Sequence, residues 1–419
     1  MKVVLVHGRF ANSWEAQGLG YIGAYLRRHA PDVELGFFQG CMDDDETILA
    51  GTADADIVAF GCTSPSMRHA LGLAGRIKAE NPAAHIVFGG YHPSALPDQT
   101  VAHPAVDQVV VGEGEAAMLD IVRGDRTSVR HGRPMDFAEL PWPDRDLIRN
   151  ERNIEVAQRD TGRRITSFHS HRGCPFGCLF CADGATGCIF GKHVRFRPVS
   201  DLLDEIAVVV DRYGLDFIKF SDGTWNAPPN WALYFCRHKA ARGLTIPFFA
   251  NVHAALASAE LFQAMAEAGC REIGLGIESG SERILKSICK GITLDMVRRA
   301  VRQAKDAGLS IRGYFMVGSP EETESDLEAT EQFAAELELD EYGFSLMAPF
   351  PGTAYHGRDP ERFADVDWAA VDEYDNAFWS TRHMTNARLR EWQARLCERF
   401  GRRLTGRQRS TGPIMQARR

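Results

Sequence analysis

Short apolar runs that end at glycine or serine recur along the chain and alternate with helical patterns. Over residues 1–125 these runs are KVVLVHG, DIVAFGCTS, AHIVFGGYHPS and VDQVVVGEGE, and amphipathic stretches such as GLGYIGAYLRRHA separate them. Continuous apolar strands that alternate with helices predict a doubly wound, Rossmann-like parallel sheet in an α/β domain. Such sheets bind ligands at the carboxyl ends of their strands, so the loops there are expected to line a binding groove or, as the alternative, merely to form turns.

The same alternation resumes over residues 166–356. DFIKFSDGTW, IPFFANVHA, REIGLGIESG and LSIRGYFMVGSPEE have the character of strands, and the helical stretch TLDMVRRAVRQAKDAG ends at a glycine. This half is expected to form a partial, TIM-like (β/α) barrel with its site in the loops that follow the strands. Residues 126–165, charged and proline-containing, predict a connector. Residues 357–419 predict a short helical region, helical over 366–379, with a basic tail.

Composition excludes several classes of function. A net charge of −8 argues against a nucleic acid as the main partner. No run approaches the roughly 18–20 apolar residues of a membrane span, and the apolar start MKVVLV lacks the features of a signal peptide. The ten cysteines then lie in a chain expected to be cytoplasmic, where disulfides are disfavoured. A tight cluster of cysteines in such a chain needs a chemical explanation.

The stretch HRGCPFGCLFC holds three such cysteines, Cys174, Cys178 and Cys181. A structural zinc site takes four ligands, usually as two separated pairs, and no second Cys-x-x-Cys pair follows here. Cys188 is the nearest candidate for a fourth zinc ligand. An iron–sulfur cluster ordinarily takes four thiolates as well, so three would leave one iron open. Both alternatives stand on spacing alone.

The pattern Cys-x3-Cys-x2-Cys, with Phe180 before its last cysteine, resembles the signature of the radical S-adenosylmethionine (SAM) family. KHVRFRPVSDLLDEI, GLGIESGSERILKSICKGIT, GYFMVGSPEET and APFPGTAYH extend the resemblance over 166–356. It implies a [4Fe–4S] cluster on the three cysteines with SAM as the fourth ligand, cleaved to a 5′-deoxyadenosyl radical. The further cofactor contacts that it implies are Phe180, Asp222, Glu278, Ser279, Met316 and Val317. A salt bridge at the barrel mouth is the alternative for Glu278, and simple core packing is the alternative for Met316 and Val317.

The N-terminal loops lack the G-x-G-x-x-G dinucleotide fingerprint and resemble the cobalamin-binding domain that precedes many radical SAM enzymes. The matching segments are QGLGYIGAYL, GCTSPS, FGGYHPSALP and VVVGEGEAA. The resemblance implies that the groove for the nucleotide tail is lined by Thr63, Ser64, Ser66, Gly89 and Gly90. It also implies that the corrin is bordered by Gly112, Glu113, Gly114 and Glu115.

The chain has no Asp-x-His-x-x-Gly string, which supplies a histidine to cobalt in other cobalamin proteins. The resemblance therefore implies cobalamin without a histidine ligand. His7, His69 and His92 are expected to be loop or surface histidines. Arg68 is the candidate for the lower face of the corrin, and a surface role for it is equally open.

Together the two resemblances predict a cobalamin-dependent radical SAM methyltransferase that alkylates carbon or phosphorus in a small-molecule or peptide natural-product precursor. One SAM would methylate the cobalamin and a second would supply the radical, with electrons from an external reductant such as flavodoxin or ferredoxin. The alternative keeps the cofactors but performs a cyclisation or rearrangement. A methylthio-transferring tRNA enzyme fits less well, because such enzymes carry three cysteines in the N-terminal domain, whereas residues 1–125 contain only Cys41 and Cys62. A non-enzymatic carrier would leave the SAM motifs unexplained.

Overall fold

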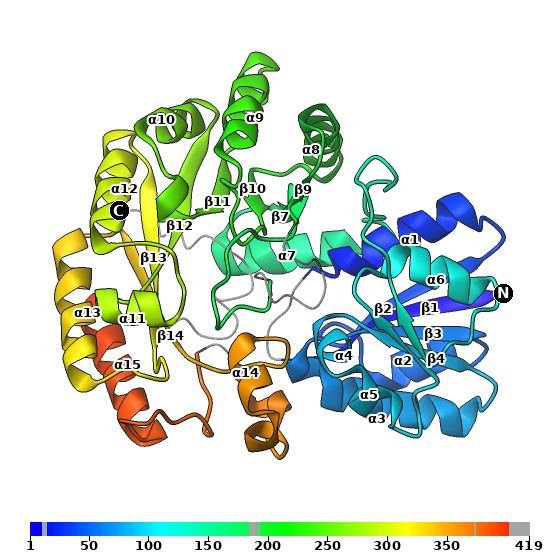
Figure 1. Ribbon diagram of the computed structural model, residues 1–419. Helices are drawn as coiled ribbons and strands as arrows, with labels where there is room; N and C mark the ends of the chain where they lie inside the picture. The colour runs from blue at the N-terminus through cyan, green and yellow to red at the C-terminus, as the bar shows by residue number, and fades with distance from the viewer. Residues whose placement is uncertain (11–14, 184–189, 191–192, 373, 402–419) are drawn as a thin grey trace. The chain divides into compact units, whose positions relative to one another are not determined.

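The computed structural model describes residues 1–10, 15–183, 190, 193–372 and 374–401. The chain divides into two compact units, and Figure 1 shows their helices and strands. The first unit consists mainly of residues 1–153 together with 350–370. The second consists mainly of residues 154–183, 193–349 and 371–401.

In the described part of the first unit, six parallel strands form a sheet in the order β2-β1-β3-β4-β5-β6. The strands are β1 (Lys2–His7), β2 (Glu34–Gln39), β3 (Ile57–Gly61), β4 (His85–Gly89), β5 (Gln108–Val111) and β6 (Val129–His131). The strand order reverses between β1 and β3, whose carboxyl ends meet where His7 pairs with Gly61. Ligands of open parallel sheets bind at such a switch point.

Helices cover both faces of this sheet, as continuous apolar strands require. The helices are α1 (Gln17–His29), α2 (Asp45–Thr52), α3 (Met67–Glu80), α4 (Tyr91–Ala95), α5 (Pro97–Val101) and α6 (Gly114–Val122), and a 3-10 turn, η1 (Ser64–Ser66), precedes α3. One apolar cluster joins the sheet to α1 and α6, and a second joins it to α2 and α3. The predicted doubly wound domain is confirmed.

The stretch expected as a connector contributes to the first unit. Strand β6 extends the sheet beside β5, and the N–H of Asp144 donates to the carbonyl of Gly20 on α1 at 3.0 Å. A Cβ on Gly23 would lie 2.2 Å from Leu147 Cδ2, so a larger residue there would displace the Leu147 side chain. The segment therefore packs on the domain that precedes it, and α7 (Asn150–Thr161) follows.

The second unit is a partial barrel. Its described residues form a sheet of six parallel strands in the order β14-β13-β12-β11-β10-β7 and an antiparallel pair, β8-β9. The strands are β7 (Ile165–Phe168), β8 (His171–Arg172), β9 (Arg195–Phe196), β10 (Phe217–Phe220), β11 (Phe248–Val252), β12 (Cys270–Glu278), β13 (Ser310–Val317) and β14 (Glu341–Leu346). The strand–helix alternation predicted from the sequence is confirmed here too.

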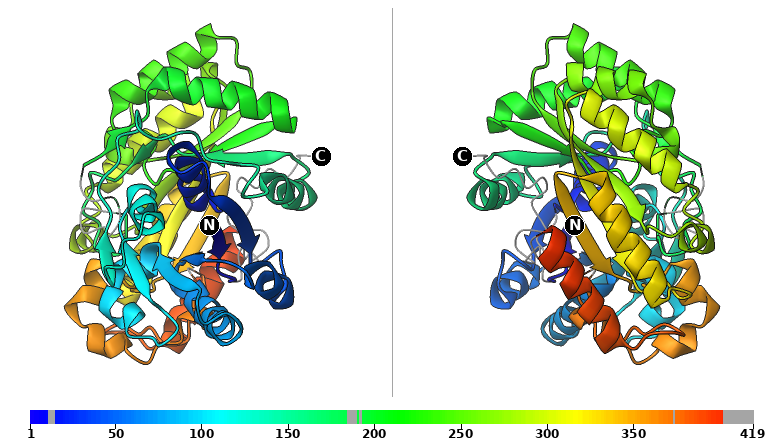
Figure 2. Two further views of the ribbon diagram at one scale, coloured as in Figure 1. Left: turned by 90° about the vertical axis from the view of Figure 1, so that its right-hand side faces the viewer. Right: turned by 90° about the vertical axis from the view of Figure 1, so that its left-hand side faces the viewer.

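Helices line the outer side of this sheet. They are α8 (Val199–Tyr213), α9 (Pro229–Ala241), α10 (Ala259–Glu267), α11 (Glu282–Ser287), α12 (Leu294–Asp306), α13 (Glu324–Leu337) and α15 (Asn386–Phe400), and η2 (Ala254–Leu256) is a 3-10 turn. The right-hand view of Figure 2 shows α12 (yellow), α13 (gold) and α15 (red) side by side on one face. The strands themselves end in loops, and the cysteine loop is one of these.

The helix predicted over residues 366–379 is wrong. Between α14 (Ala354–Arg358) and α15, the described residues form only the short 3-10 turns η3 (Pro360–Phe363) and η4 (Trp368–Ala370). Aspartate side chains compete with the helix here: Asp372 Oδ1 accepts from the N–H groups of Tyr374 and Asp375 at 2.6 and 2.8 Å. Such side chain–backbone bonds favour turns over helix.

Candidate functional site

The carboxylate of Asp222 fixes the segment from which the cysteine loop starts. Asp222 follows β10 and is buried; its Oδ1 accepts from the N–H groups of Ser170 and His171 at 3.0 and 3.2 Å. Its Oδ2 accepts from Ser170 Oγ at 2.9 Å. The side chain is therefore used within the fold, while the expected contact of the Asp222 loop backbone with SAM stays a prediction.

Two further barrel loops hold the cysteine loop in place. The N–H of Leu179 donates to the carbonyl of Ile288 at 3.0 Å. The ring of Phe176 stacks on the His253 imidazole, with centroids 3.6 Å apart and an interplanar angle of 11°. His253 Nε2 lies 3.2 Å from the carbonyl oxygen of Lys290. The segment 288–290 therefore contacts the cysteine loop directly and, through His253, a second time.

The three cysteines share one loop and interact electrostatically with one another. Cys178 is buried, and Cys174 and Cys181 are half-buried, with Cys174 Sγ 3.6 Å from Thr224 Oγ1. Burial raises the pKa of Cys178 to about 11 and that of Cys181 to about 12. Both thiols are therefore protonated at pH 7 in the absence of iron, and binding a cluster as thiolates would release these protons.

No three His, Cys, Asp or Glu side chains in the described part of the chain converge closely enough to hold one metal ion. A four-iron cluster asks for a different arrangement, since each thiolate binds its own iron. Three neighbouring, sheltered thiols on one loop fit that demand. Cys188, the alternative zinc ligand, lies outside the described residues.

Glu278 ends β12 and forms an ion pair beside the cysteine loop. Its Oε1 lies 2.7 Å from Lys290 Nζ, and this ammonium lies 5.9 Å from the centroid of the Phe180 ring. Burial lowers the pKa of Lys290, but the Glu278 carboxylate and the Cys178 thiol raise it more, so it lies above its ordinary value. The salt bridge considered as the alternative for Glu278 is present, and a contact with SAM stays a prediction. The sequence analysis gave Lys290 no role. The feature that could have indicated one is the presence of a lysine in the largely apolar stretch SICKGI.

The other predicted SAM contacts lie deeper in the fold. Ser279 is fully buried, and its Oγ lies 3.2 Å from Thr330 Oγ1 on α13. Met316 and Val317, at the end of β13, are also buried. Ser279 therefore anchors the end of β12 to α13, and the adenine contacts expected of Met316 and Val317 stay predictions.

In the first unit, the loops after β3 and β4 contact each other at the carboxyl edge of the sheet. Ser64 Oγ lies 2.9 Å from His92 Nδ1, and Ser66 Oγ accepts from the N–H of Thr63 at 3.0 Å. Gly90, next to Gly89, has φ 98°, and a Cβ there would lie 2.6 Å from the carbonyl oxygen of Cys62. These residues, predicted to contact the nucleotide tail, therefore form one compact edge.

The loop after β5, predicted to border the corrin, lies at the same edge. The N–H of Gly112 donates to Ser94 Oγ at 3.0 Å, and buried Glu113 accepts from the N–H of Met135 at 3.0 Å. Gly114 begins α6, and Glu115 is buried in its first turn. The carboxylate of Glu113 thus connects this loop to residue 135, and a role toward the corrin stays a prediction.

Of the three histidines weighed as cobalt ligands, His7 and His69 are half-buried in β1 and α3, and His92 is buried in α4, so the expectation of loop or surface positions is wrong. His7 ends β1 with its Nδ1 buried and without a partner among the described residues. His69 Nδ1 accepts from the N–H of Arg9 at 3.0 Å. Burial lowers the pKa of His7 and of His92 to about 4, so both rings are neutral at pH 7. The expected absence of a histidine ligand to cobalt stays a prediction.

Arg68 lies in the first turn of α3 with its side chain 67% exposed and ion-paired with Asp367. The segment around η4 packs on η1 and on α3, so Asp367 reaches Arg68 from a position 299 residues further along the chain. No sequence signal linked these two residues. The predicted role of Arg68 below the corrin stays a prediction.

Known families account for both units. The radical SAM superfamily matches residues 169–334, and the B12 binding domain matches residues 3–122. An uncharacterized methyltransferase of Pyrococcus horikoshii is 30% identical over 80% of this chain and 76% of its own length. The chain belongs to the cobalamin-binding radical SAM enzymes. The bacteriochlorophyllide d C-12(1)-methyltransferase of Chlorobaculum tepidum is 28% identical, over 80% of this chain and 72% of its own.

Solved structures share the fold. The radical SAM methyltransferase TsrM of Kitasatospora setae, with tryptophan and a SAM analogue bound, matches with a TM-score of 0.72 at 17% identity. The match covers 87% of this chain and 77% of that one. The two families that match this chain require a [4Fe–4S] cluster, SAM and cobalamin, which are therefore its cofactors. Its SAM chemistry needs a reductant and acts on a small molecule.

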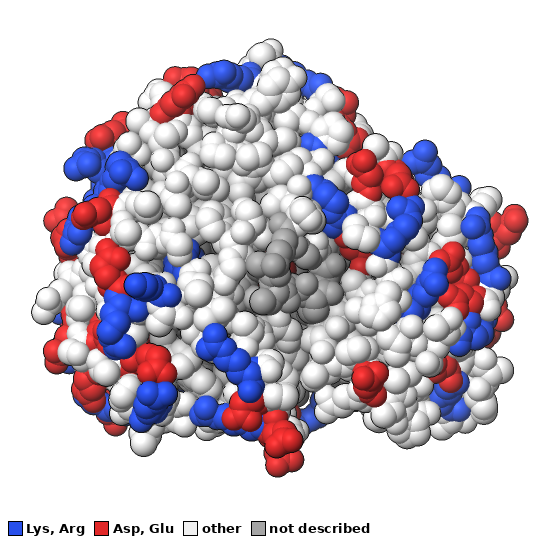
Figure 3. Space-filling model, in the orientation of Figure 1, with Lys and Arg blue, Asp and Glu red and all other residues white. Residues whose placement is uncertain are grey.

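The described residues include no helix that is long and apolar enough to cross a membrane. On the face drawn in Figure 3, acidic and basic side chains are interspersed, and no broad basic area is seen on its described residues. The charges on that face thus balance locally.

Proposed function

We propose that this enzyme transfers a methyl group to an unactivated carbon, or to phosphorus, of a small-molecule or peptide natural-product precursor. When bound, SAM supplies both the methyl group and a 5′-deoxyadenosyl radical, and cobalamin carries the methyl group. The observation that supports this most is the pairing of a three-cysteine loop at a barrel mouth with a separate B12 binding domain. The bacteriochlorophyllide relative, itself a methyltransferase, supports methyl transfer over cyclisation or rearrangement.

Within the barrel, residues of this chain would prepare the radical step. Asp222 holds the start of the cysteine loop, and Leu179 ties its middle to the 288–290 segment. A site fixed in this way keeps the reacting groups in register, and exclusion of water protects a radical from side reactions. The predicted domain boundaries at residues 125, 165 and 356 remain part of this proposal.

The partners are proposed on the same basis. One-electron delivery to a sheltered cluster suits a small carrier such as flavodoxin or ferredoxin. Nucleic acid is not a proposed partner, since the chain carries a net charge of −8. A cytoplasmic location stays a prediction from the sequence.

The test uses anaerobic enzyme loaded with cluster and cobalamin, a reductant and SAM labelled as CD3. Candidate metabolites from its gene neighbourhood are screened by mass spectrometry for gain of a CD3 group. We expect S-adenosylhomocysteine and 5′-deoxyadenosine in roughly equal amounts per methylated product. If the true substrate gives 5′-deoxyadenosine and an altered product but never S-adenosylhomocysteine, methyl transfer is excluded and a rearrangement takes its place.

A further inference from the structure

Lys290 is a buried cation in direct reach of the cysteine loop. Its side chain is 10% exposed and lies between the carboxylate of Glu278 and the ring of Phe180. It also interacts electrostatically with the thiols of Cys178 and Cys181. Burying an ammonium is costly unless charge compensates it, so its place near the thiols of Cys178 and Cys181 needs a reason.

The strand beneath leaves room for this pair. A Cβ on Gly276 would lie 2.7 Å from Lys290 Nζ and 2.8 Å from Glu278 Oε1, so any larger residue would displace both groups. The backbone at Lys290 is held as well, because its carbonyl oxygen lies 3.2 Å from His253 Nε2. The position of the ammonium is thus set by strand, loop and ion pair together.

We propose that Lys290 is a charge-balancing and positioning residue for the [4Fe–4S] cluster, favouring its reduced state. Reduction adds one electron, taken from the external reductant, to a cluster already bound by three anionic thiolates. The potential of such a cluster depends on nearby charge and burial, and a fixed ammonium lowers the energy of the more negative state. Glu278 opposes this effect by neutralising part of the ammonium. The inference rests on the cluster alone, and not on methyl transfer.

The test measures the midpoint potential of the reconstituted cluster by anaerobic redox titration, read by electron paramagnetic resonance without SAM. For Lys290→Met we expect the ratio of reduced to oxidised cluster at a fixed potential to fall about tenfold. That corresponds to a midpoint about 59 mV more negative for a one-electron couple. Lys290→Arg keeps the charge and should keep most of the potential. Lys286→Met removes an exposed lysine from α11 nearby and should leave the potential unchanged.

Glu278→Gln provides a test of opposite sign that does not depend on the stability of Lys290→Met. It keeps the size of the side chain but leaves the ammonium uncompensated, so the midpoint should become less negative. An unchanged potential in Lys290→Met with full iron content would overturn the proposal. So would a shift to more negative potential in Glu278→Gln, or a shift in Lys286→Met as large as in Lys290→Met. A role that is merely structural would not give opposite signs for the two partners of one ion pair.

Discussion

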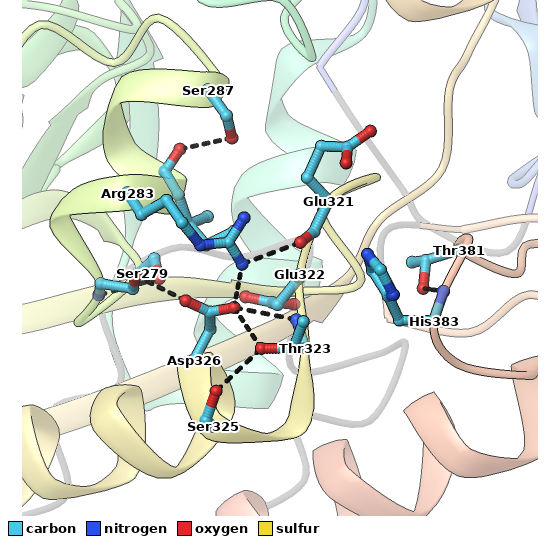
Figure 4. A network of polar contacts seen from close by, with 12 residues as sticks. Ser279, Arg283, Ser287, Glu321, Glu322, Thr323, Ser325, Asp326, Thr381 and His383 are labelled. Carbon is cyan, nitrogen blue, oxygen red and sulfur yellow. Dashed lines mark hydrogen bonds and ion pairs between the residues drawn. The ribbon is translucent and has the colours of Figure 1, made fainter.

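The buried carboxyl of Glu322 should make the stability of the second unit depend on pH. Glu322 lies in the loop between β13 and α13 with no exposed surface, and its Oε2 accepts from the N–H of Gly318 at 2.7 Å. Its Oε1 is buried without a partner among the described residues. Figure 4 shows it beside the ion pair of Arg283 and Asp326. Burial raises the pKa of Glu322 from 4.5 to about 8, although the N–H groups of Gly318 and Ser319 lower it.

The sign of the effect follows from the two states. Below pH 4.5 Glu322 holds its proton whether the protein is folded or unfolded, so its contribution to stability is complete. Between pH 4.5 and about 8 only the folded state holds the proton, and stability falls by about 1.36 kcal/mol per pH unit. From pH 5.5 to 7.5 this amounts to roughly 2–3 kcal/mol, or about 5–10 °C in melting temperature for a unit of this size.

The variant Glu322→Gln isolates this term, because glutamine accepts the same backbone bond and does not ionise. We expect the melting temperature of the variant, relative to that of the wild type, to be about 5–10 °C higher at pH 7.5 than at pH 5.5. Glu321→Gln is the matched control, since it removes a neighbouring carboxyl that is 42% exposed. Calorimetry of the cluster-loaded proteins at several pH values gives both comparisons. The reasoning would be refuted if the difference in melting temperature between Glu322→Gln and the wild type varied with pH no more than the difference between Glu321→Gln and the wild type.

Two further predictions concern the cofactors. Replacing any one of Cys174, Cys178 and Cys181 with alanine should abolish the reconstituted cluster, because only three thiolates bind it. Cys188→Ala should keep its iron. Equal iron loss in Cys188→Ala would show that the ligands are wrongly assigned. The enzyme in its cob(II)alamin form should show no nitrogen superhyperfine splitting in electron paramagnetic resonance, and such splitting would contradict cobalamin binding without a histidine.

The parallel sheets and the family were predictable because they rest on local patterns. Many core strands are short apolar runs that end at, or just before, a glycine or polar residue, such as KVVLVHG for β1 or REIGLGIE within β12, and burial of both faces dictates that composition. The cysteine loop was equally plain, since its ligands lie within eight residues. What these features share is that neighbours in sequence carry the whole signal.

The features that sequence reasoning missed depend on contacts between distant segments. Asp367 pairs with Arg68 only because residues 350–370 belong to the first unit. The histidines at positions 7, 69 and 92 are at least half-buried because loops and helices close over them, and a histidine's own sequence neighbours do not report that. The helix predicted over 366–379 shows the reverse case, because a locally helical pattern was outweighed by Asp372, whose side chain accepts from nearby backbone N–H groups.

Glu278 unites both kinds of information. It has φ 66°, a region that costs a residue with a side chain about 1 kcal/mol or more and that glycine occupies freely. The register with β13 shifts between Gly276 and Glu278, and irregularities of this kind re-aim a side chain at the end of a strand. Ser279 and Gly280 behind it are both hydrogen-bonded to Thr330 Oγ1, which holds the strained turn in place. A strained residue that is held by its surroundings and carries a carboxylate beside the cluster cysteines indicates that the side chain, not the backbone, is what the site needs there.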